Sequence, residues 1–253
     1  MKTPRGNPLA VTSRLWPCSL AENLRRISEW DLPIRPIREV GLLFYETETS
    51  LAYPLETFAP LAGLSSHAHL PMDLPWEAGA HAVWDILRRL MEKPAEGAFC
   101  KPWGGVLHPP EDPGLLAGVA ELWRKAAPGW RLMVENIPTQ DLRAHWPVIV
   151  EMDLAVCLDV GHLIAFGQEW LLHEPDLPNR VTLVHCYAPG ERPNYHVHLP
   201  LSELTPAQAP LVRRILDMVS PAVPILFEIF SYEHLLASLE RFYQLDEQEE
   251  KYE

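Results

Sequence analysis

Cysteine is scarce in this chain, and basic residues are fewer than acidic ones. The four cysteines, Cys18, Cys100, Cys157 and Cys186, form no Cys-x-x-Cys pair, and the last two lie within apolar runs. We therefore expect free thiols in a cytoplasmic protein instead of a disulfide framework. Lysine and arginine number 21 against 34 aspartates and glutamates, a net charge of −13. This balance argues against holding nucleic acid or an anionic membrane surface through bulk charge.

Long apolar runs are missing too. No segment approaches the length of a membrane span, and residues 1–14 contain no apolar core like that of a secretory signal. We expect no membrane partner. The 253 residues, 47% of them hydrophobic, suffice for one substantial core. We predict a single domain, 1–253, with an acidic, frayed tail at 246–253.

Short apolar runs rich in β-branched residues alternate along the chain with amphipathic stretches. This alternation is typical of a parallel sheet covered by helices. We predict strands at 9–15, 40–45, 61–69, 105–108, 131–135, 155–159, 181–186 and 224–229, and helices at 20–29, 77–91, 114–126, 140–151, 166–173, 206–219 and 233–243, with a weaker candidate at 54–60. Eight strands in about 250 residues predict a (β/α)8 TIM barrel. The alternative, a doubly wound sheet, usually carries a Gly-x-Gly-x-x-Gly turn that this chain lacks.

Most of the predicted strands end on a residue that can bind a metal ion. The carboxyl ends of the strands form the mouth of a TIM barrel, so residues far apart in sequence would meet there. Glu135 and Glu228 each close an apolar run, where a carboxylate is rarely placed without a partner. A shared cation would neutralise several carboxylates, and we therefore predict a metal site. The candidate ligands are His69, His108, Glu135, Asp159, His162, His185, His196, His198 and Glu228.

Spacing supports this prediction. Residues i and i+2 of a strand point to the same face, so His67 and His69 would both face the mouth, as would the pair at 196 and 198 in an extended segment. Gly161, between Asp159 and His162, is expected to let the backbone bend sharply.

Four further residues are candidates for contacting substrate. Arg192, in the loop after the seventh strand, would hold a phosphate bidentately. Lys101, before the fourth strand, is a weaker candidate for the same task. Glu46 follows the second strand and would lie at the mouth. His67 is either a substitute metal ligand or a residue that supports the site.

Together these residues resemble the xylose isomerase-like TIM barrels, which include sugar isomerases and epimerases and the endonuclease IV family (AP endonuclease family 2). The similarity extends from about residue 61 to residue 228. Its most specific pieces are Val134-Glu135-Asn136, Cys157-Leu-Asp159-Val-Gly-His162, Val184-His185 and Phe227-Glu228.

The resemblance implies one of two kinds of site. Isomerases and epimerases of this type hold one divalent ion through two glutamates, an aspartate and a histidine, which here are Glu135, Asp159, His185 and Glu228. Sites of the endonuclease IV type add histidines and hold a cluster of ions, usually zinc. The candidates for that larger set are His69, His108, His162 and His198. His196 stands where that family carries an aspartate.

A closer resemblance is to the cobamide-remodelling phosphodiesterases, a small-molecule branch of the same superfamily. It rests on Ala21-Glu22-Asn23, on the Leu-Leu-Phe-Tyr-Glu segment 42–46, on His69-Leu-Pro-Met-Asp73, and on His185-Cys-Tyr with His196-Val-His198. That family is understood to hydrolyse the phosphodiester of the cobamide nucleotide loop, leaving a corrinoid phosphate and a riboside. The proline-rich loop 188–194 departs from its pattern.

Three functions remain open at this point, with a non-catalytic binding module as a distant fourth. The first is hydrolysis of a small-molecule phosphodiester, such as a corrinoid, with one to three divalent ions; zinc is preferred to manganese, iron or cobalt. Glu135, Glu228 and His185 would be its catalytic residues. The second is sugar isomerisation or epimerisation, which needs one ion and leaves the extra histidines unexplained. The third is cleavage of DNA at abasic sites, which the net charge disfavours, so nucleic acid is not the expected partner.

Overall fold

The computed structural model describes residues 6–30, 37, 39–96, 101–126, 129–192 and 194–247. In this part of the chain eight parallel strands close into a barrel in sequence order, and β8 pairs with β1. The strands are β1 Leu9–Thr12, β2 Glu39–Leu43, β3 Ser65–His69, β4 Gly104–Leu107, β5 Arg131–Glu135, β6 Ala155–Asp159, β7 Val181–Cys186 and β8 Ile225–Phe227. The predicted TIM barrel is confirmed.

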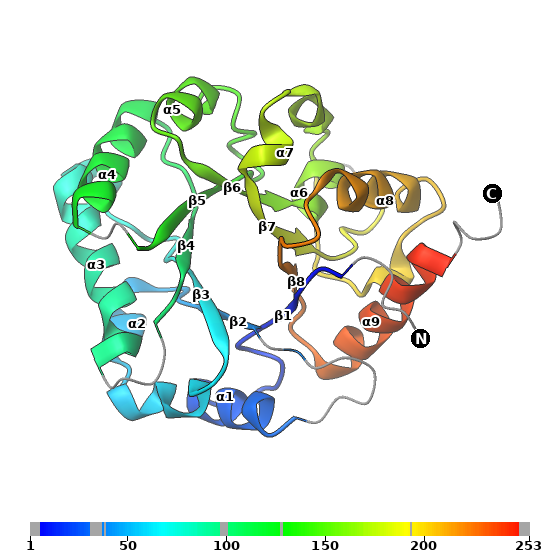
Figure 1. Ribbon diagram of the computed structural model, residues 1–253, viewed down its shortest axis with the longest axis horizontal. Coiled ribbons are helices and arrows are strands. Elements are labelled where there is room, and N and C mark those ends of the chain that lie inside the picture. Colours follow the sequence, from blue (N-terminus) through cyan, green and yellow to red (C-terminus); the bar gives the residue numbers. More distant parts are fainter. Residues whose placement is uncertain are drawn as a thin grey trace.

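Helices surround the barrel, as Figure 1 shows. The α-helices are α1 Leu20–Ser28, α2 Thr47–Ala52, α3 Ala80–Glu96, α4 Pro113–Ala126, α5 Trp146–Glu151, α6 Val160–Ala165, α7 Leu177–Arg180, α8 Ala209–Met218 and α9 Tyr232–Glu247. Short 3-10 helices lie at Leu55–Leu61, Trp76–Ala78, Glu169–His173 and Leu201–Glu203. The helices bury apolar stripes against the strands; in α1 the stripe is Leu20, Leu24 and Ile27, at helical spacing.

The apolar core has two parts, because successive strand residues point to opposite faces. Outward-facing residues such as Val40, Val134 and Val184 pack under the helices. A smaller cluster fills the interior of the barrel and consists of Ala10, Val106, Met133, Ala155, Cys157, Leu183 and Leu226.

The interior cluster explains why polar residues gather at one end. Val106, Met133, Cys157, Leu183 and Leu226 all face the barrel interior. Two positions further along the chain, on the same face, stand His108, Glu135, Asp159, His185 and Glu228. The two-residue period of the strands therefore places five side chains that can bind a metal ion at the mouth, next to the apolar cluster that fills the barrel interior.

Several elements differ from their predicted bounds. The predicted strand 61–69 begins only at Ser65, because residues 55–61 form a 3-10 helix. The predicted helix 140–151 keeps only α5, since Leu142 has a φ of 68° that no right-handed helix can accommodate. Of the predicted helix 166–173, residues 169–173 form a 3-10 helix, and the α-helix in this region, α6, ends at Ala165 before the predicted start. α6 starts directly after Asp159, whose Oδ1 accepts a 2.6 Å hydrogen bond from the backbone N–H of His162.

The carboxyl end is helical further than predicted. Helix α9 continues to Glu247, so residues 246 and 247, predicted as part of the tail, are helical. Residues 248–253 and Cys100 lie outside the described residues. Cys157 and Cys186 are buried free thiols, as predicted. Within the described ranges, no helix has the length and apolarity of a membrane span.

Candidate metal centre

Glu135, the last residue of β5, lies at the centre of the mouth, and its two carboxylate oxygens face different groups. Oε1 is 2.8 Å from Nδ1 of His185 on β7. Oε2 is 3.0 Å from Nε2 of His108 and 3.3 Å from Nε2 of His69. The Glu135 side chain is 1% exposed. Strands β3, β4 and β7 thus bring three imidazoles around one buried carboxylate.

Asp159, His185 and Glu228 complete a second group around the same carboxylate. Nδ1 of His185 is 3.4 Å from Oε2 of Glu228 and 3.9 Å from Oδ2 of Asp159. Potential ligand atoms of these three residues and Glu135 all lie within 4.8 Å of one another. The same is true of His69, His108 and Glu135. Glu135 therefore belongs to two sets of potential metal donors.

Three further histidines lie on the other side of Asp159 and Glu228. Nδ1 of His162 is 3.4 Å from Oδ2 of Asp159, and its Nε2 is 3.2 Å from Nε2 of His196. Nε2 of His198 is 3.3 Å from Oε2 of Glu228. All the histidines predicted as metal ligands are thus at the mouth.

Asn136 and Gln168 hold the Asp159 backbone in place. The Asn136 amide accepts a 2.8 Å hydrogen bond from the Asp159 N–H and donates a 2.9 Å bond to the Asp159 carbonyl. It also donates to Oε1 of Gln168, whose own amide donates to the Ile137 carbonyl. Gln168 was missed by sequence reasoning because it stands in an irregular segment far from any strand end.

The charges of the site are mutually dependent. Burial would raise the pKa of Glu135, but the charge of His185 and the nearby rings of His108 and His69 hold it well below its usual range. The pKa of Glu228 is lowered in the same way by His185 and His198. Burial and the charges of Glu228 and Glu135 instead raise the pKa of Asp159 well above its ordinary value. Three buried carboxylates therefore depend on the surrounding imidazoles, above all His185, and on bound protons unless a cation is present.

The residues present fit a divalent metal ion. Oε2 of Glu135, Oδ2 of Asp159 and both ring nitrogens of His185 are buried without a well-aligned hydrogen-bond partner. Such atoms are costly unless something else satisfies them. Carboxylate and imidazole are the donors that zinc and related divalent ions use, so a cation would satisfy these atoms together.

Gly161 is required for a reason other than the one predicted. It has an ordinary negative φ, but a Cβ at this position would lie 2.1 Å from the Tyr187 ring. Tyr187 is fully buried, and its ring centroid is 4.1 Å from that of His198. The glycine therefore makes room for Tyr187 beside the histidines of the mouth and does not serve a bend.

Two of the predicted substrate contacts lie elsewhere. His67 is fully buried inside the barrel, where Nδ1 is 2.7 Å from Oε1 of Glu39, and the Trp103 indole N–H donates to the same oxygen. It faces the interior like His69 but one layer deeper, away from the mouth. Lys101 precedes β4 and therefore lies at the opposite end of the barrel, with Nζ 5.8 Å from the Trp130 ring centre.

The other two predicted contacts are on the same end as the metal centre. Arg192 is exposed, lines a hollow with Phe166 and Gln208, and stacks over Tyr195 instead of reaching the metal donors. Glu46 follows β2 and lines a hollow of about 220 Å³ at the mouth.

Sequence reasoning missed two neighbours of Glu46. Arg14 and Tyr45 line the same hollow, and the Arg14 guanidinium is 5.0 Å from the Tyr45 ring centre. Burial and the charge of Glu228 raise the pKa of Tyr45. Both residues follow directly on β1 and β2, strands that place no donor in the clusters at the mouth.

Comparison with known proteins adds to this picture. No family model and no curated protein matches the chain. A sugar phosphate isomerase/epimerase from Parabacteroides distasonis has a similar structure, with TM-score 0.60 and 12% identity over 96% of this chain and 98% of that one. So does a D-allulose 3-epimerase from Methylomonas sp. in complex with D-allulose, with TM-score 0.60 and 13% identity over 96% and 99%. A xylose isomerase-like TIM barrel protein from Mycobacterium smegmatis in complex with magnesium gives 0.59 and 14% over 97% and 98%. The chain therefore shares its barrel fold with these proteins.

Proposed function

We propose that the protein is a metal-dependent hydrolase that cleaves a phosphodiester in a small molecule. The observation that carries the proposal is the Glu135 carboxylate, which faces His69 and His108 through one oxygen and His185 through the other. A carboxylate shared by two donor sets is typical of sites with two ions about 4 Å apart, and such sites serve hydrolysis of phosphate esters.

The donor sets suggest where ions would bind. His69, His108 and Glu135 would hold one, and Glu135, Asp159, His185 and Glu228 another. The histidines at 162, 196 and 198 would offer donors for a third, beside Asp159 and Glu228. Bound divalent ions activate water and offset the charge that develops on phosphate oxygens. Zinc is the expected metal, with manganese, iron and cobalt as alternatives.

The chain's own residues orient groups and move protons. Oε2 of Glu228 is 3.3 Å from Nε2 of His198, so this pair is suited to take a proton and pass it towards solvent. His185 is held by carboxylates on several sides and is suited to keep Glu135 and Glu228 in position. The hydrogen bonds of Asn136 fix Asp159 for the same purpose.

The substrate we favour is compact. A net charge of −13 disfavours long DNA. The hollow lined by Arg14, Tyr45 and Glu46 lies beside the mouth and offers a cation and an aromatic ring to a small ligand. The nucleotide loop of a cobamide, with its single phosphodiester, is the candidate to test first.

Sugar isomerisation or epimerisation is the second candidate. It is favoured by the set Glu135, Asp159, His185 and Glu228, which suffices for one ion. Similar folds also occur in the sugar phosphate isomerase/epimerase and the D-allulose 3-epimerase described above. In this reading His69 and His108 have no role in the chemistry.

One experiment separates the two candidates. The protein is purified without oxygen, its metal content per chain is measured, and it is assayed on phosphodiesters, including adenosylated cobamides, and on ketoses and sugar phosphates. His108→Ala is compared with His81→Ala, an exposed histidine on α3. We expect two or three ions per chain, phosphodiester cleavage, and loss of one ion with roughly a hundredfold loss of turnover in His108→Ala only.

A single bound ion, together with sugar turnover that His108→Ala leaves intact, would establish the second candidate and reject the first. Absence of metal, with no cleavage in any reconstituted form, would reject both.

A further inference from the structure

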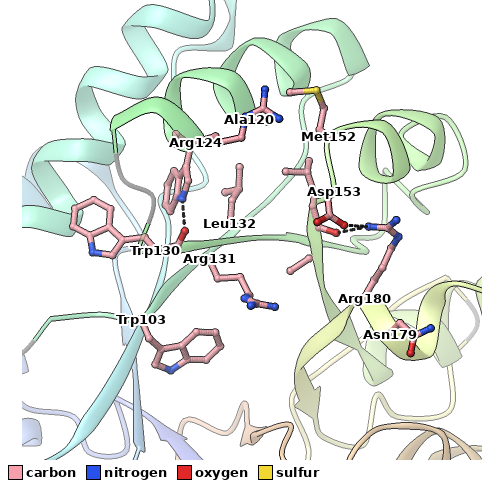
Figure 2. A pocket seen from close by; sticks show the side chains of 14 residues that line it. Trp103, Ala120, Arg124, Trp130, Arg131, Leu132, Met152, Asp153, Asn179 and Arg180 are labelled. Atoms are coloured by element: carbon pink, nitrogen blue, oxygen red, sulfur yellow. Dashed lines mark hydrogen bonds and ion pairs between the residues drawn. The ribbon is translucent and has the colours of Figure 1, made fainter.

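A third hollow lies at the opposite end of the barrel from the metal centre. Trp103 and Arg131 stand at the amino ends of β4 and β5, and Arg180 directly precedes β7; all three line it. Its volume is about 670 Å³, which is typical of small-molecule sites. Figure 2 shows it between the end of α4 and the segment around Met152 and Asp153 that leads into β6.

The hollow is basic in an otherwise acidic chain. Three arginines line it, at 124, 131 and 180, whereas Asp153 is the only acid among its lining residues. Within the described ranges, the side chains of Arg124 and Arg131 have neither an ion pair nor a hydrogen bond. Lys101 lies nearby, over the ring of Trp130. Like charges gathered without partners in a concave surface attract anions.

Arg180 is fixed, whereas the other two arginines are free to adjust. Its Nη1 donates to the carbonyl of Leu154 at 3.3 Å and to Oδ1 of Asp153 at 3.1 Å. The Arg180 side chain is 14% exposed, but that of Asp153 is 95% exposed. Asp153 is thus mostly in water, where it offsets little of the arginine charge. In Figure 2, Arg180 and Arg131 lie on opposite sides of the hollow.

Flat apolar surfaces lie beside these cations. Trp103 is half-buried at the hollow, and its indole N–H is already used by Glu39, so only its ring remains for a ligand. The indole N–H of Trp123 donates to the Trp130 carbonyl at 2.9 Å, which fixes the neighbouring wall. Leu132 lines the hollow beside them. Indole beside guanidinium suits a planar ring that carries an anionic group.

We call this hollow the base pocket because it lies at the amino ends of the barrel strands. We propose that it binds a small organic phosphate with an aromatic ring, of the nucleoside monophosphate class. Arg124 and Arg131, whose side chains are free to adjust, take the phosphate, Arg180 adds positive charge to the wall, and Trp103 packs against the ring. The site is separate from the metal centre and does not depend on the reaction performed there.

The test is calorimetric titration of the protein, stripped of metal so that no phosphate binds to ions, with AMP, GMP, CMP, UMP and phenyl phosphate. Adenosine and inorganic phosphate are the matched probes that lack one half of the ligand. We expect at least one aromatic phosphate to bind at least tenfold more tightly than either. Arg131→Ala and Arg124→Ala should each weaken that binding about tenfold or more.

Arg143→Ala is the control, because Arg143 is an exposed arginine stacked over Trp170 outside the base pocket. It should leave the affinity unchanged, as should Glu135→Gln at the metal centre. Failure of every aromatic phosphate to bind, equal binding of inorganic phosphate, or an affinity that Arg131→Ala leaves intact would each overturn the proposal. Circular dichroism checks that the variants are folded.

Discussion

Nδ1 of His185 lies 2.8 Å from Oε1 of Glu135, and both side chains are withdrawn from solvent. Burial would lower the pKa of His185, but Cys157, Glu228 and Glu135 raise it well above its ordinary value. The imidazolium form therefore stabilises the carboxylates in the metal-free protein. A metal ion bound by the same atoms would displace that proton, because ligating imidazole is neutral. A proton and a metal ion thus compete for the imidazole of His185.

Replacing the carboxylate of Glu135, which both donor sets share, should weaken metal binding by both sets. Glu135→Gln removes a charge that faces His69, His108 and His185, so we expect at least a hundredfold weaker metal binding and loss of turnover. Metal analysis after dialysis checks the first and an activity assay the second. Glu121→Gln, an exposed residue of α4, is the control and should behave as wild type. A Glu135→Gln protein with full metal content would contradict the assignment.

The Asn136 side chain should act on the metal through Asp159. Asn136→Ala removes the bonds to the Asp159 backbone and to Gln168 and leaves every candidate donor in place. We expect metal affinity to fall roughly 10- to 100-fold, as for other residues that orient ligands. Competition with a chelator of known affinity measures this. An unchanged affinity would mean that Asp159 is positioned by its own strand.

Gly161→Ala should destabilise the protein through a clash with one ring. The added Cβ would lie 2.1 Å from Tyr187, and overpacking of this kind costs about 1–3 kcal/mol in the free energy of unfolding. Urea denaturation measures the loss. Gly129→Ala is the matched control, because its nearest neighbour is 3.9 Å away. In a Tyr187→Leu background the Gly161→Ala cost should shrink; an equal cost there would show that the backbone, and not the ring, requires glycine.

The metal-free protein should lose stability as the solution is acidified. Burial and the charges of His162 and His198 lower the pKa of His196 to about 4. The unfolded chain, in which histidine titrates near 6.5, binds this proton more readily. The contribution of His196 is therefore complete above about pH 6.5 and is lost as pH falls towards 4. Melting temperatures in EDTA across this window should fall less steeply for His196→Gln than for wild type.

His81→Gln, on the exposed face of α3, supplies the comparison for that experiment. Since several buried groups titrate together, the difference between the two variants is the informative quantity. Identical slopes for both would contradict the lowered pKa of His196.

The strand period accounts for most of what the sequence could predict. Met133 and Glu135, or Leu183 and His185, share a face, so an apolar interior and a polar mouth follow from alternation alone. Depth along the barrel does not follow from that alternation. His67 shares a face with His69, yet it is bonded to Glu39 one layer below. A strand pattern tells which way a side chain points, but not how the staggered register places it along the axis.

Contacts between loops, and packing between helices and strands, could not be predicted from the sequence either. Nothing in the sequence brings Tyr187 against Gly161, because that clearance depends on how β7 and α6 pack. Arg14 and Tyr45 follow different strands and meet only once β1 pairs with β2. Lys101, in contrast, was misplaced although its position before a strand already indicated the far end of the barrel.

The donors at the mouth come from β3 to β8 and the segments that follow them, whereas β1 and β2 are followed by Arg14, Tyr45 and Glu46. The mouth is therefore divided unequally: the ends of six strands hold the candidate metal donors, and the ends of the other two hold none of them. Mutations in the first part are constrained by every ligand at once. Residues in the second part can be substituted one at a time without changing a metal ligand. Substrate specificity can therefore change, in nature or in the laboratory, through substitutions in the segments after β1 and β2.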